Sequence, residues 1–171
     1  MMYTPELEYC LRQLMKRKRG QYAVLPCDLL DTYEVRTYPV LLIVNNEPTG
    51  EDGEHWVAMY IKRAGAEVEF FCSYGKPISY YSYHFTSFAR RLRCSVLENE
   101  RRCQGSESST CGQFAVFFLY KRLRGCPLSS IYCIFTNDYT RNDKIVVSFV
   151  KRLPKFKFIL SKKHQCCKPE N

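Results

Sequence analysis

The sequence predicts an α+β fold in which a buried helix packs against a β-sheet, and three patterns support this prediction. Residues 40–44 form a continuous β-branched and apolar run, as expected of a buried strand. Residues 55–61 and 68–72 are two further strand-like runs with a turn between them. Residues 114–120 are apolar on every side, which is typical of a helix enclosed by other elements. We therefore expect this helix to form a layer beside the sheet.

The other segments surround this core within one domain, 1–171, because no linker or repeat divides the 171 residues. Thr4-Pro5 has the residue types that open a helix, and this helix is predicted to end at Gly20. An amphipathic helix is expected at 85–92. The remaining expectations are a loop at 45–53, irregular chain at 101–110, an end of the buried helix at Gly125, a helix from 145–149 to before Pro154, and an edge strand at 155–160.

Charge and hydropathy limit the partners. The net charge is +9, from 26 Lys and Arg against 17 Asp and Glu, which favours an anionic partner, nucleic acid first. Solubility alone explains this charge equally well. No apolar run reaches the length of about 18 residues that a membrane span needs, so no membrane partner is expected. The N-terminus lacks an apolar signal segment, so we expect a protein used inside a cell or packed in a particle.

The ten cysteines are expected to be free thiols, because no secretion signal precedes them. Most of them should behave as small buried apolar residues. His164, Cys166 and Cys167 are the nearest approach to a metal cluster. Zinc needs four ligands from spaced pairs, and the chain contains no C-x-x-C pair, so no metal is expected.

Cys111 is the best candidate for a nucleophile. It lies where a polar loop turns into the predicted buried helix, and the field of a helix N-terminus favours a thiolate. Gly112 would let a substrate backbone approach closely. The amide of Gln104, seven residues earlier, could donate to a developing oxyanion. Cys111 alone could equally be a buried structural cysteine at a helix start.

A thiol nucleophile needs an imidazole, and His55 opens a predicted strand after a polar loop, where it could reach the edge of a cleft. Trp56, which follows it, could line this cleft as a substrate contact or pack beneath it. Cys72 ends the next predicted strand, seventeen residues after His55.

Taken together, these segments resemble the adenovirus-type (adenain-like) processing proteases, and above all those of polinton-like (Maverick) elements and related double-stranded DNA viruses. The resemblance covers residues 22–150, about three quarters of the chain. The stretches that carry it are 43–45, 53–58, 71–75, 104–114 and 117–120, with a weaker match at 135–150.

This resemblance implies an α+β fold of the adenain and ubiquitin-like-protease type, a papain-like core in permuted chain order. A central mixed sheet would pack on a buried helix that carries the nucleophile. It also implies three catalytic roles: Cys111 as nucleophile, His55 as general base and Gln104 in the oxyanion hole. The reaction would be peptide hydrolysis through an acyl-enzyme, without a metal or small-molecule cofactor.

Cys72 departs from the family pattern, because the family has Asp or Glu at this position to orient the histidine. A neutral thiol accepts a hydrogen bond poorly. Three explanations follow: a catalytic dyad with a looser His55, another orienting group such as Ser73, a water or a backbone carbonyl, or a weakened or inactive copy. The intact Cys111 and His55 favour activity.

Similar enzymes mature capsid and core proteins by cutting near small residues and glycine, so the resemblance implies such protein substrates. It also implies a monomer located in the virion and the host nucleus, with activation by DNA and a short viral peptide. Non-specific DNA contacts would come from the basic residues that flank the site, which are Arg90, Arg91, Arg93, Arg101 and Arg102. A solvated helix face explains these arginines equally well. Cys94 is a candidate for a disulfide to the peptide, or it is a free thiol.

Two alternative functions share the same residues. A deconjugating protease for ubiquitin-like tails would use the same Cys111 and His55. A protease-fold protein that binds DNA or capsid without catalysis would explain the loss of the acid at Cys72.

Overall fold

The computed structural model describes residues 2–153, and its centre is a five-stranded sheet with the order β1-β2-β3-β4-β5. The strands are β1 (Gln21–Pro26), β2 (Val40–Asn45), β3 (Trp56–Ile61), β4 (Val68–Phe71) and β5 (Val96–Glu98). The outer pairs β1–β2 and β4–β5 are parallel, and the inner pairs β2–β3 and β3–β4 are antiparallel. The sheet is therefore mixed, as predicted.

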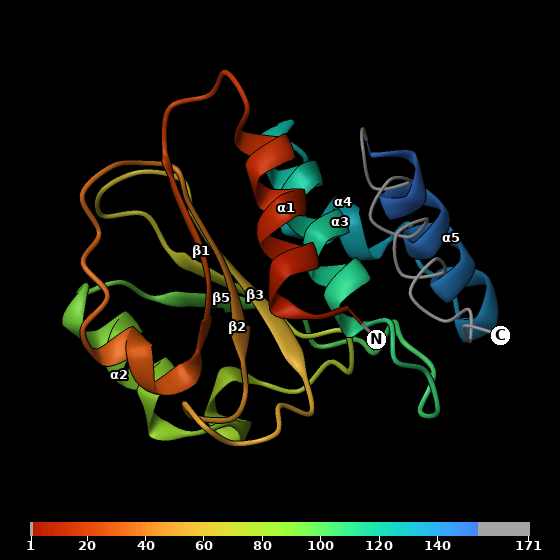
Figure 1. The fold of residues 1–171 in the computed structure, drawn as a ribbon, viewed down its shortest axis with the longest axis horizontal. Coiled ribbons are helices and arrows are strands. Elements are labelled where there is room, and N and C mark those ends of the chain that lie inside the picture. The colour runs from red at the N-terminus through yellow and green to blue at the C-terminus, as the bar shows by residue number, and fades with distance from the viewer. Residues whose placement is uncertain (1, 154–171) are drawn as a thin grey trace, which may run out of the picture.

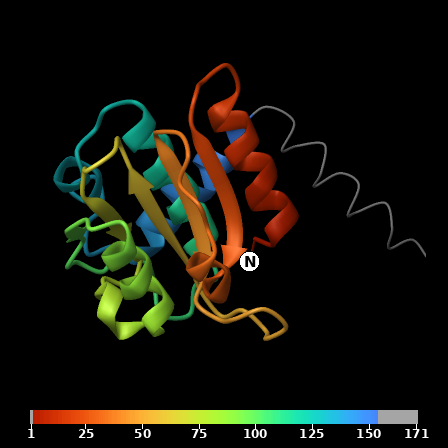
Figure 2. The ribbon, with the colours of Figure 1, turned by 90° about the vertical axis from the view of Figure 1, so that its left-hand side faces the viewer.

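Helices cover both faces of this sheet. They are α1 (Thr4–Met15), α2 (Tyr83–Arg91), α3 (Cys111–Leu123), α4 (Leu128–Tyr132) and α5 (Tyr139–Arg152), with two 3₁₀ turns, η1 (Cys27–Asp31) and η2 (Ile78–Tyr80). Helices α1 and α3 pack on one face, with α5 outside α3 (Figure 1). Helix α2 lies on the opposite face, towards the viewer in Figure 2.

Burial on both faces explains why β2 and β3 read as continuous apolar runs rather than alternating ones. Successive side chains of a strand point to opposite faces. Leu41 and Ile43 pack with α1 and α3, whereas Leu42 and Val44 pack with Phe88 of α2. Each face of the sheet thus has its own hydrophobic cluster.

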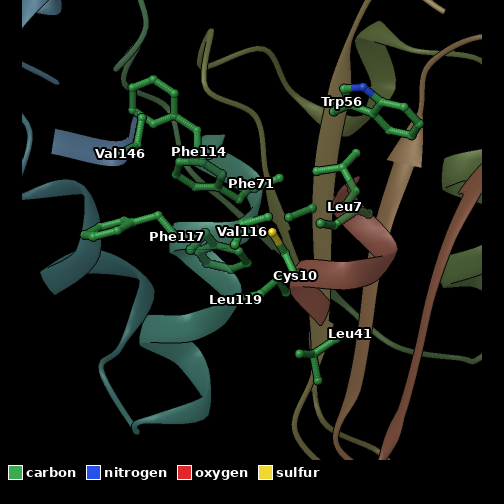
Figure 3. Close-up of a cluster of buried hydrophobic side chains, with 14 of the residues drawn as sticks. Leu7, Cys10, Leu41, Trp56, Phe71, Phe114, Val116, Phe117, Leu119 and Val146 are labelled. Atoms are coloured by element: carbon green, nitrogen blue, oxygen red, sulfur yellow. The ribbon is translucent and has the colours of Figure 1, made fainter. Parts of the chain in front are cut away.

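The cluster between the sheet and α3 fixes the helix that begins at Cys111. Figure 3 shows Leu7 and Cys10 of α1 beside Val116 of α3, in front of the strands. The rings of Phe71 and Phe118 stack with centroids 4.8 Å apart and an interplanar angle of 7°. Because α3 is enclosed by α1, the sheet and α5, it is apolar on all sides, as the sequence predicts.

Some element boundaries differ from the prediction. Helix α1 ends at Met15 and not at Gly20, because Arg17 and Gly20 both adopt positive φ angles (66° and 135°) that no α-helix contains. The sequence analysis missed the strand β1 and the short elements β5 and α4. Helix α5 begins at Tyr139, six residues before the predicted start at Ile145.

Other expectations concern residues 154–171, the absence of a membrane span and the number of domains. The predicted strand at 155–160 and the residues His164, Cys166 and Cys167 lie outside the described residues. Within residues 2–153, no helix is long and apolar enough to cross a bilayer. The single domain 1–171 remains a prediction.

Candidate active site

Cys111 is the first residue of α3 and is almost fully buried. Its neighbour Thr110 is the N-cap, and the Thr110 hydroxyl donates a 2.8 Å hydrogen bond to Asp143 of α5. The first amide N–H groups of a helix have no intrahelical acceptor. The Cys111 sulfur therefore lies at a helix end whose amide groups are available to an anion.

His55 immediately precedes β3, which packs against α3. Its main chain is fixed by Asn46: the His55 N–H donates to Asn46 Oδ1 (2.7 Å), and the Asn46 N–H donates to the His55 carbonyl (3.0 Å). The main-chain N–H of Trp56, the next residue, faces the Cys111 sulfur and acts to lower the pKa of this thiol, because it would donate a hydrogen bond to the thiolate. The structure thus brings Cys111 to the residue that follows His55, and the pairing of Cys111 with the His55 imidazole remains a prediction.

Two tyrosines and a thiol surround the imidazole. The Nε2 atom of His55 lies 3.5 Å from the sulfur of Cys72, and this sulfur lies 3.0 Å from the hydroxyl of Tyr81. The ring of Tyr74 contacts the imidazole at a centroid distance of 4.8 Å. Among the described residues, the buried Nδ1 atom of His55 has no hydrogen-bond partner. Nδ1 is therefore the ring nitrogen that is available to take a proton from a nucleophile.

Gln104 is fully buried and is positioned by the end of β4. The hydroxyl of Ser73 donates to Gln104 Oε1 (2.6 Å), and the Ser73 carbonyl accepts the N–H groups of Cys103 (2.8 Å) and Gln104 (3.0 Å). The Gln104 amide nitrogen donates one hydrogen to the carbonyl of Ser108 (2.6 Å). An amide nitrogen carries two hydrogens, so a second donor remains for an oxyanion.

The loop from Cys103 to Thr110 is fixed by α5. Asn142 is buried, and its Nδ2 donates to the carbonyls of Cys103 (2.9 Å) and Thr136 (2.8 Å). Asp143 accepts the hydrogen bond from the Thr110 hydroxyl. These two neighbouring side chains hold both ends of the loop that carries Gln104. They belong to the weakly matching segment 135–150 of the sequence analysis.

Burial determines the protonation states at rest. Desolvation raises the pKa of the Cys111 thiol, although the N–H groups of Trp56 and Gly112 act in the opposite direction. Desolvation lowers the pKa of His55 to about 4. Both shifts favour the neutral pair of thiol and imidazole at neutral pH. A thiolate would then form as Cys111 transfers its proton to His55.

The low pKa of His55 predicts a loss of stability in acid. The unfolded chain takes up a proton at His55 below about pH 6.5, whereas the folded protein does so only near pH 4. The free energy of unfolding should therefore fall as the pH decreases from 6.5 to 4, by about 3 kcal/mol at most. Urea unfolding of the wild type and of His55→Gln at several pH values measures this contribution as the difference between the two curves. Parallel curves would contradict the prediction.

A pocket of about 600 Å³ opens beside His55. Tyr74, Tyr81, Asn46 and Lys76 are among its lining residues, and Glu47 adds a carboxylate. Cys111 is not among them, so this space adjoins the site on the histidine side.

Trp56 and Gly112, the two predicted substrate contacts, lie among core residues. Trp56 is 7% exposed, and its indole N–H donates to the carbonyl of Met2 (3.1 Å). A side chain at Gly112 would approach Met2 and Leu7 to 3.1 Å, so glycine here permits close packing of the N-terminal segment on α3. Their contact with substrate remains a prediction.

The five predicted DNA-binding arginines differ in their surroundings. Arg91 donates to the carbonyls of Leu30 (2.8 Å) and Tyr33 (2.9 Å), and Arg101 donates to the carbonyl of Phe135. Arg102 donates to the carbonyl of Gln104 (2.7 Å) and lies over the rings of Tyr74 and Tyr139. All of the five except the half-buried Arg102 are exposed, but the structure gives Arg90 and Arg93 no such hydrogen bond among the described residues. Three of the five guanidinium groups therefore stabilise the fold, and the DNA contact remains a prediction.

Cys94, the predicted attachment point of an activator peptide, is a half-buried free cysteine between α2 and β5. Its sulfur donates to the carbonyl of Leu92 (3.3 Å). The disulfide remains a prediction.

The sequence analysis missed Tyr81 and Asn99. Tyr81 follows η2 and reaches Cys72, and Asn99 hydrogen-bonds both the N–H and the carbonyl of Cys72. No local motif marks either residue. The antiparallel register of β3 and β4 pairs Ala58 with Phe71, and its continuation places His55 opposite Tyr74. This register is the signal that could have indicated an aromatic environment for His55.

Comparison with solved structures defines the class of fold. The chain superposes on the ASFV pS273R protease with a TM-score of 0.64, covering 85% of this chain and 66% of that one at 14% identity. It superposes on ChlaDub1 from Chlamydia trachomatis with a TM-score of 0.61, covering 90% and 93% at 15% identity. The described residues thus share the mixed α/β fold of these two proteins.

At the level of sequence, no family profile matches the chain. One relative is a protein of Acanthamoeba polyphaga mimivirus that is provisionally named thiol protease R355, with 25% identity over 138 residues. This match covers 77% of the chain but only 44% of the mimivirus protein, so the chain spans less than half the length of this relative.

Proposed function

We propose that this chain is a cysteine endopeptidase with Cys111 as nucleophile, His55 as base and Gln104 in the oxyanion hole. One observation supports this most: a cysteine at a buried helix N-terminus contacts the main-chain N–H of Trp56, and the preceding residue is a histidine whose Nδ1 has no partner among residues 2–153. A buried polar atom without a hydrogen-bond partner lowers the stability of the folded protein, so such an atom is often one that the function requires. Transfer of a proton from the thiol of Cys111 would satisfy this nitrogen.

Each residue has a defined role in the proposed reaction. The thiol of Cys111 gives its proton to His55 Nδ1, and its sulfur forms a bond to the scissile carbonyl carbon. The oxyanion is stabilised by the second amide hydrogen of Gln104 and by the N–H groups at the start of α3. His55 then protonates the leaving amine as the C–N bond breaks, leaving a thioester. A water activated by His55 hydrolyses this thioester and restores the thiol.

The proposed substrates are capsid or core precursor proteins, cut near small residues and glycine. The viral origin of the mimivirus relative and of the ASFV neighbour supports this part of the proposal. His55 protonates the leaving amine, so the leaving half of the substrate passes over the imidazole. The pocket of about 600 Å³ beside His55 is suited to this half.

The same proposal places the protein in the virion and the host nucleus, as a monomer stimulated by DNA and by a short viral peptide. The net charge of +9 and the exposed Arg90 and Arg93 support an interaction with DNA. Such phosphate contacts would weaken steeply as salt increases.

The experiment that tests this function compares two kinds of substrate. Peptides with an internal Gly-containing site are incubated with the protein, with and without duplex DNA at low and high salt. Fusions that end in the diglycine tail of a ubiquitin-like protein are incubated in parallel. We expect cleavage of internal sites and labelling of Cys111 by a thiol-reactive substrate mimic, identified by mass spectrometry.

The opposite outcomes are equally clear. Cleavage restricted to the diglycine fusions would replace the processing function by deconjugation. No cleavage together with no labelling of Cys111 would indicate a protease-fold protein that binds DNA or capsid without catalysis.

A further inference from the structure

Within residues 2–153, no carboxylate hydrogen-bonds the imidazole of His55. The Nε2 atom of His55 faces the sulfur of Cys72, and this sulfur faces the hydroxyl of Tyr81. We infer that Cys72 and Tyr81 together act as the positioning group for His55, a neutral thiol–phenol pair in the place of an acid. This inference rests on the proposed function, because it assigns how the base of that reaction is held.

Counting donors and acceptors determines the direction of these hydrogen bonds. If His55 Nδ1 is to accept a proton from Cys111, the imidazole must carry its proton on Nε2. The Nε2–H group then donates to the Cys72 sulfur at 3.5 Å. In the inferred chain the Cys72 S–H donates to the Tyr81 oxygen at 3.0 Å, since a sulfur that donates its own hydrogen becomes a better acceptor for Nε2–H. The phenol thus strengthens a thiol that would be a weak acceptor alone.

Both members of the pair are rigidly held. Asn99 accepts from the Cys72 N–H (2.9 Å) and donates to the Cys72 carbonyl (2.8 Å), which fixes the backbone just beyond β4. The ring of Tyr81 contacts those of Phe70 and Phe85 at centroid distances of 5.9 and 5.7 Å. A positioning group needs such support, because small displacements weaken a short hydrogen-bond chain.

The tyrosine has a second role in fixing the plane of the imidazole. Its ring is nearly parallel to that of His55, with an interplanar angle of 12° and a centroid distance of 6.0 Å. Tyr74 contacts the imidazole at 4.8 Å. The two rings restrict rotation of the histidine, while the Cys72 sulfur selects its tautomer.

The pair differs from an acid in charge. Burial raises the pKa of the Cys72 thiol, which keeps this group neutral at neutral pH. Desolvation lowers the pKa of His55 to about 4, and no carboxylate among the described residues is hydrogen-bonded to its ring to stabilise the imidazolium form. The titratable and charged groups around this imidazole are Cys72, Tyr74, Tyr81, Cys111, Glu47, Glu54 and Lys76.

The test combines steady-state kinetics with NMR of the His55 ring nitrogens. Tyr81→Phe keeps the ring and removes the hydroxyl, and Cys72→Ala removes the acceptor. We expect both variants to lower kcat by about tenfold or more with little change in KM, and to lose the Nε2–H tautomer. Tyr83→Phe and Cys126→Ala are matched controls, because these residues lie outside the site, and both should retain the wild-type kcat.

Cys72→Asp gives the second readout. A carboxylate beside Nε2 should raise the pKa of His55 by about one unit or more, and the acid limb of the pH profile of kcat/KM should move upwards with it. The Asp variant should retain the Nε2–H tautomer that the Ala variant loses.

The outcomes separate this inference from the proposed protease function. If the wild type cleaves peptides but neither kcat nor the tautomer changes in Tyr81→Phe and Cys72→Ala, the positioning role is excluded and the protease function stands. If the wild type cleaves nothing but both variants lose the Nε2–H tautomer, the positioning role is supported and the protease function is not.

Discussion

Replacement of Cys111 by alanine is expected to lower kcat/KM for peptide cleavage by about 10⁴- to 10⁶-fold. The reason is chemical, because alanine offers no atom that can form the thioester. The other parts of the site should remain, since Gln104 is held by Ser73 and His55 by Asn46. Peptide cleavage measured at saturating and low substrate concentrations should show a loss of kcat, with substrate binding retained.

A matched control comes from the other buried thiols. Cys103→Ala removes a sulfur of similar burial at the start of the loop that carries Gln104. Cys10→Ala removes a buried sulfur of α1, in the hydrophobic cluster that α1 shares with α3. Both should retain activity in proportion to their folded fraction. Equal losses in Cys111→Ala and Cys10→Ala would show that the thiol acts through packing and would contradict its role as nucleophile.

The Phe118→Ala substitution is expected to destabilise the fold by about 3–5 kcal/mol. The Phe118 ring is fully buried and stacks on Phe71 of β4, so its removal opens a cavity between α3 and the sheet. A loss of this size is a large part of the 5–15 kcal/mol that typically separates folded from unfolded chains, about one fifth or more. Because Cys111 begins the same helix, activity should also decrease.

Urea unfolding followed by the fluorescence of Trp56 measures this effect directly, since Trp56 is the only tryptophan and lies in the same hydrophobic cluster. Leu97→Ala is the control. Leu97 is 41% exposed on β5, and its truncation should cost less than about 1 kcal/mol. A comparable change for both variants would mean that the stack of Phe71 and Phe118 contributes little.

Local sequence patterns determined much of the fold. The apolar runs at 40–44 and 114–120 predicted a buried strand and a buried helix because burial on all sides leaves no place for polar residues. The polar loop before Cys111 predicted the start of a helix at the thiol. In contrast, β1 and β5 are edge strands whose half-exposed residues form no such pattern, and only their pairing with β2 and β4 defines them.

The candidate catalytic residues were also proposed from the sequence, because their residue types and their order along the chain resemble those of a known protease family. The neighbours of these residues were not predicted. Tyr81 lies nine residues after Cys72, and Asn99 lies twenty-seven residues after it, at distances along the chain that no spacing rule covers. Their contacts depend on how η2 and the chain after β5 return to the end of β4.

The sequence by itself thus determined the layer order of helix and sheet and the identity of Cys111, His55 and Gln104 as candidates, since both follow from residue type and short-range periodicity. The tertiary structure decided what surrounds these residues. Arg91, Arg101 and Arg102 became structural donors, Gly112 became a packing contact, and Cys72 acquired Tyr81 as a partner. The physical reason is that hydrogen bonds and ring contacts act over a few ångströms, and only the folded chain brings residues from distant segments within that range.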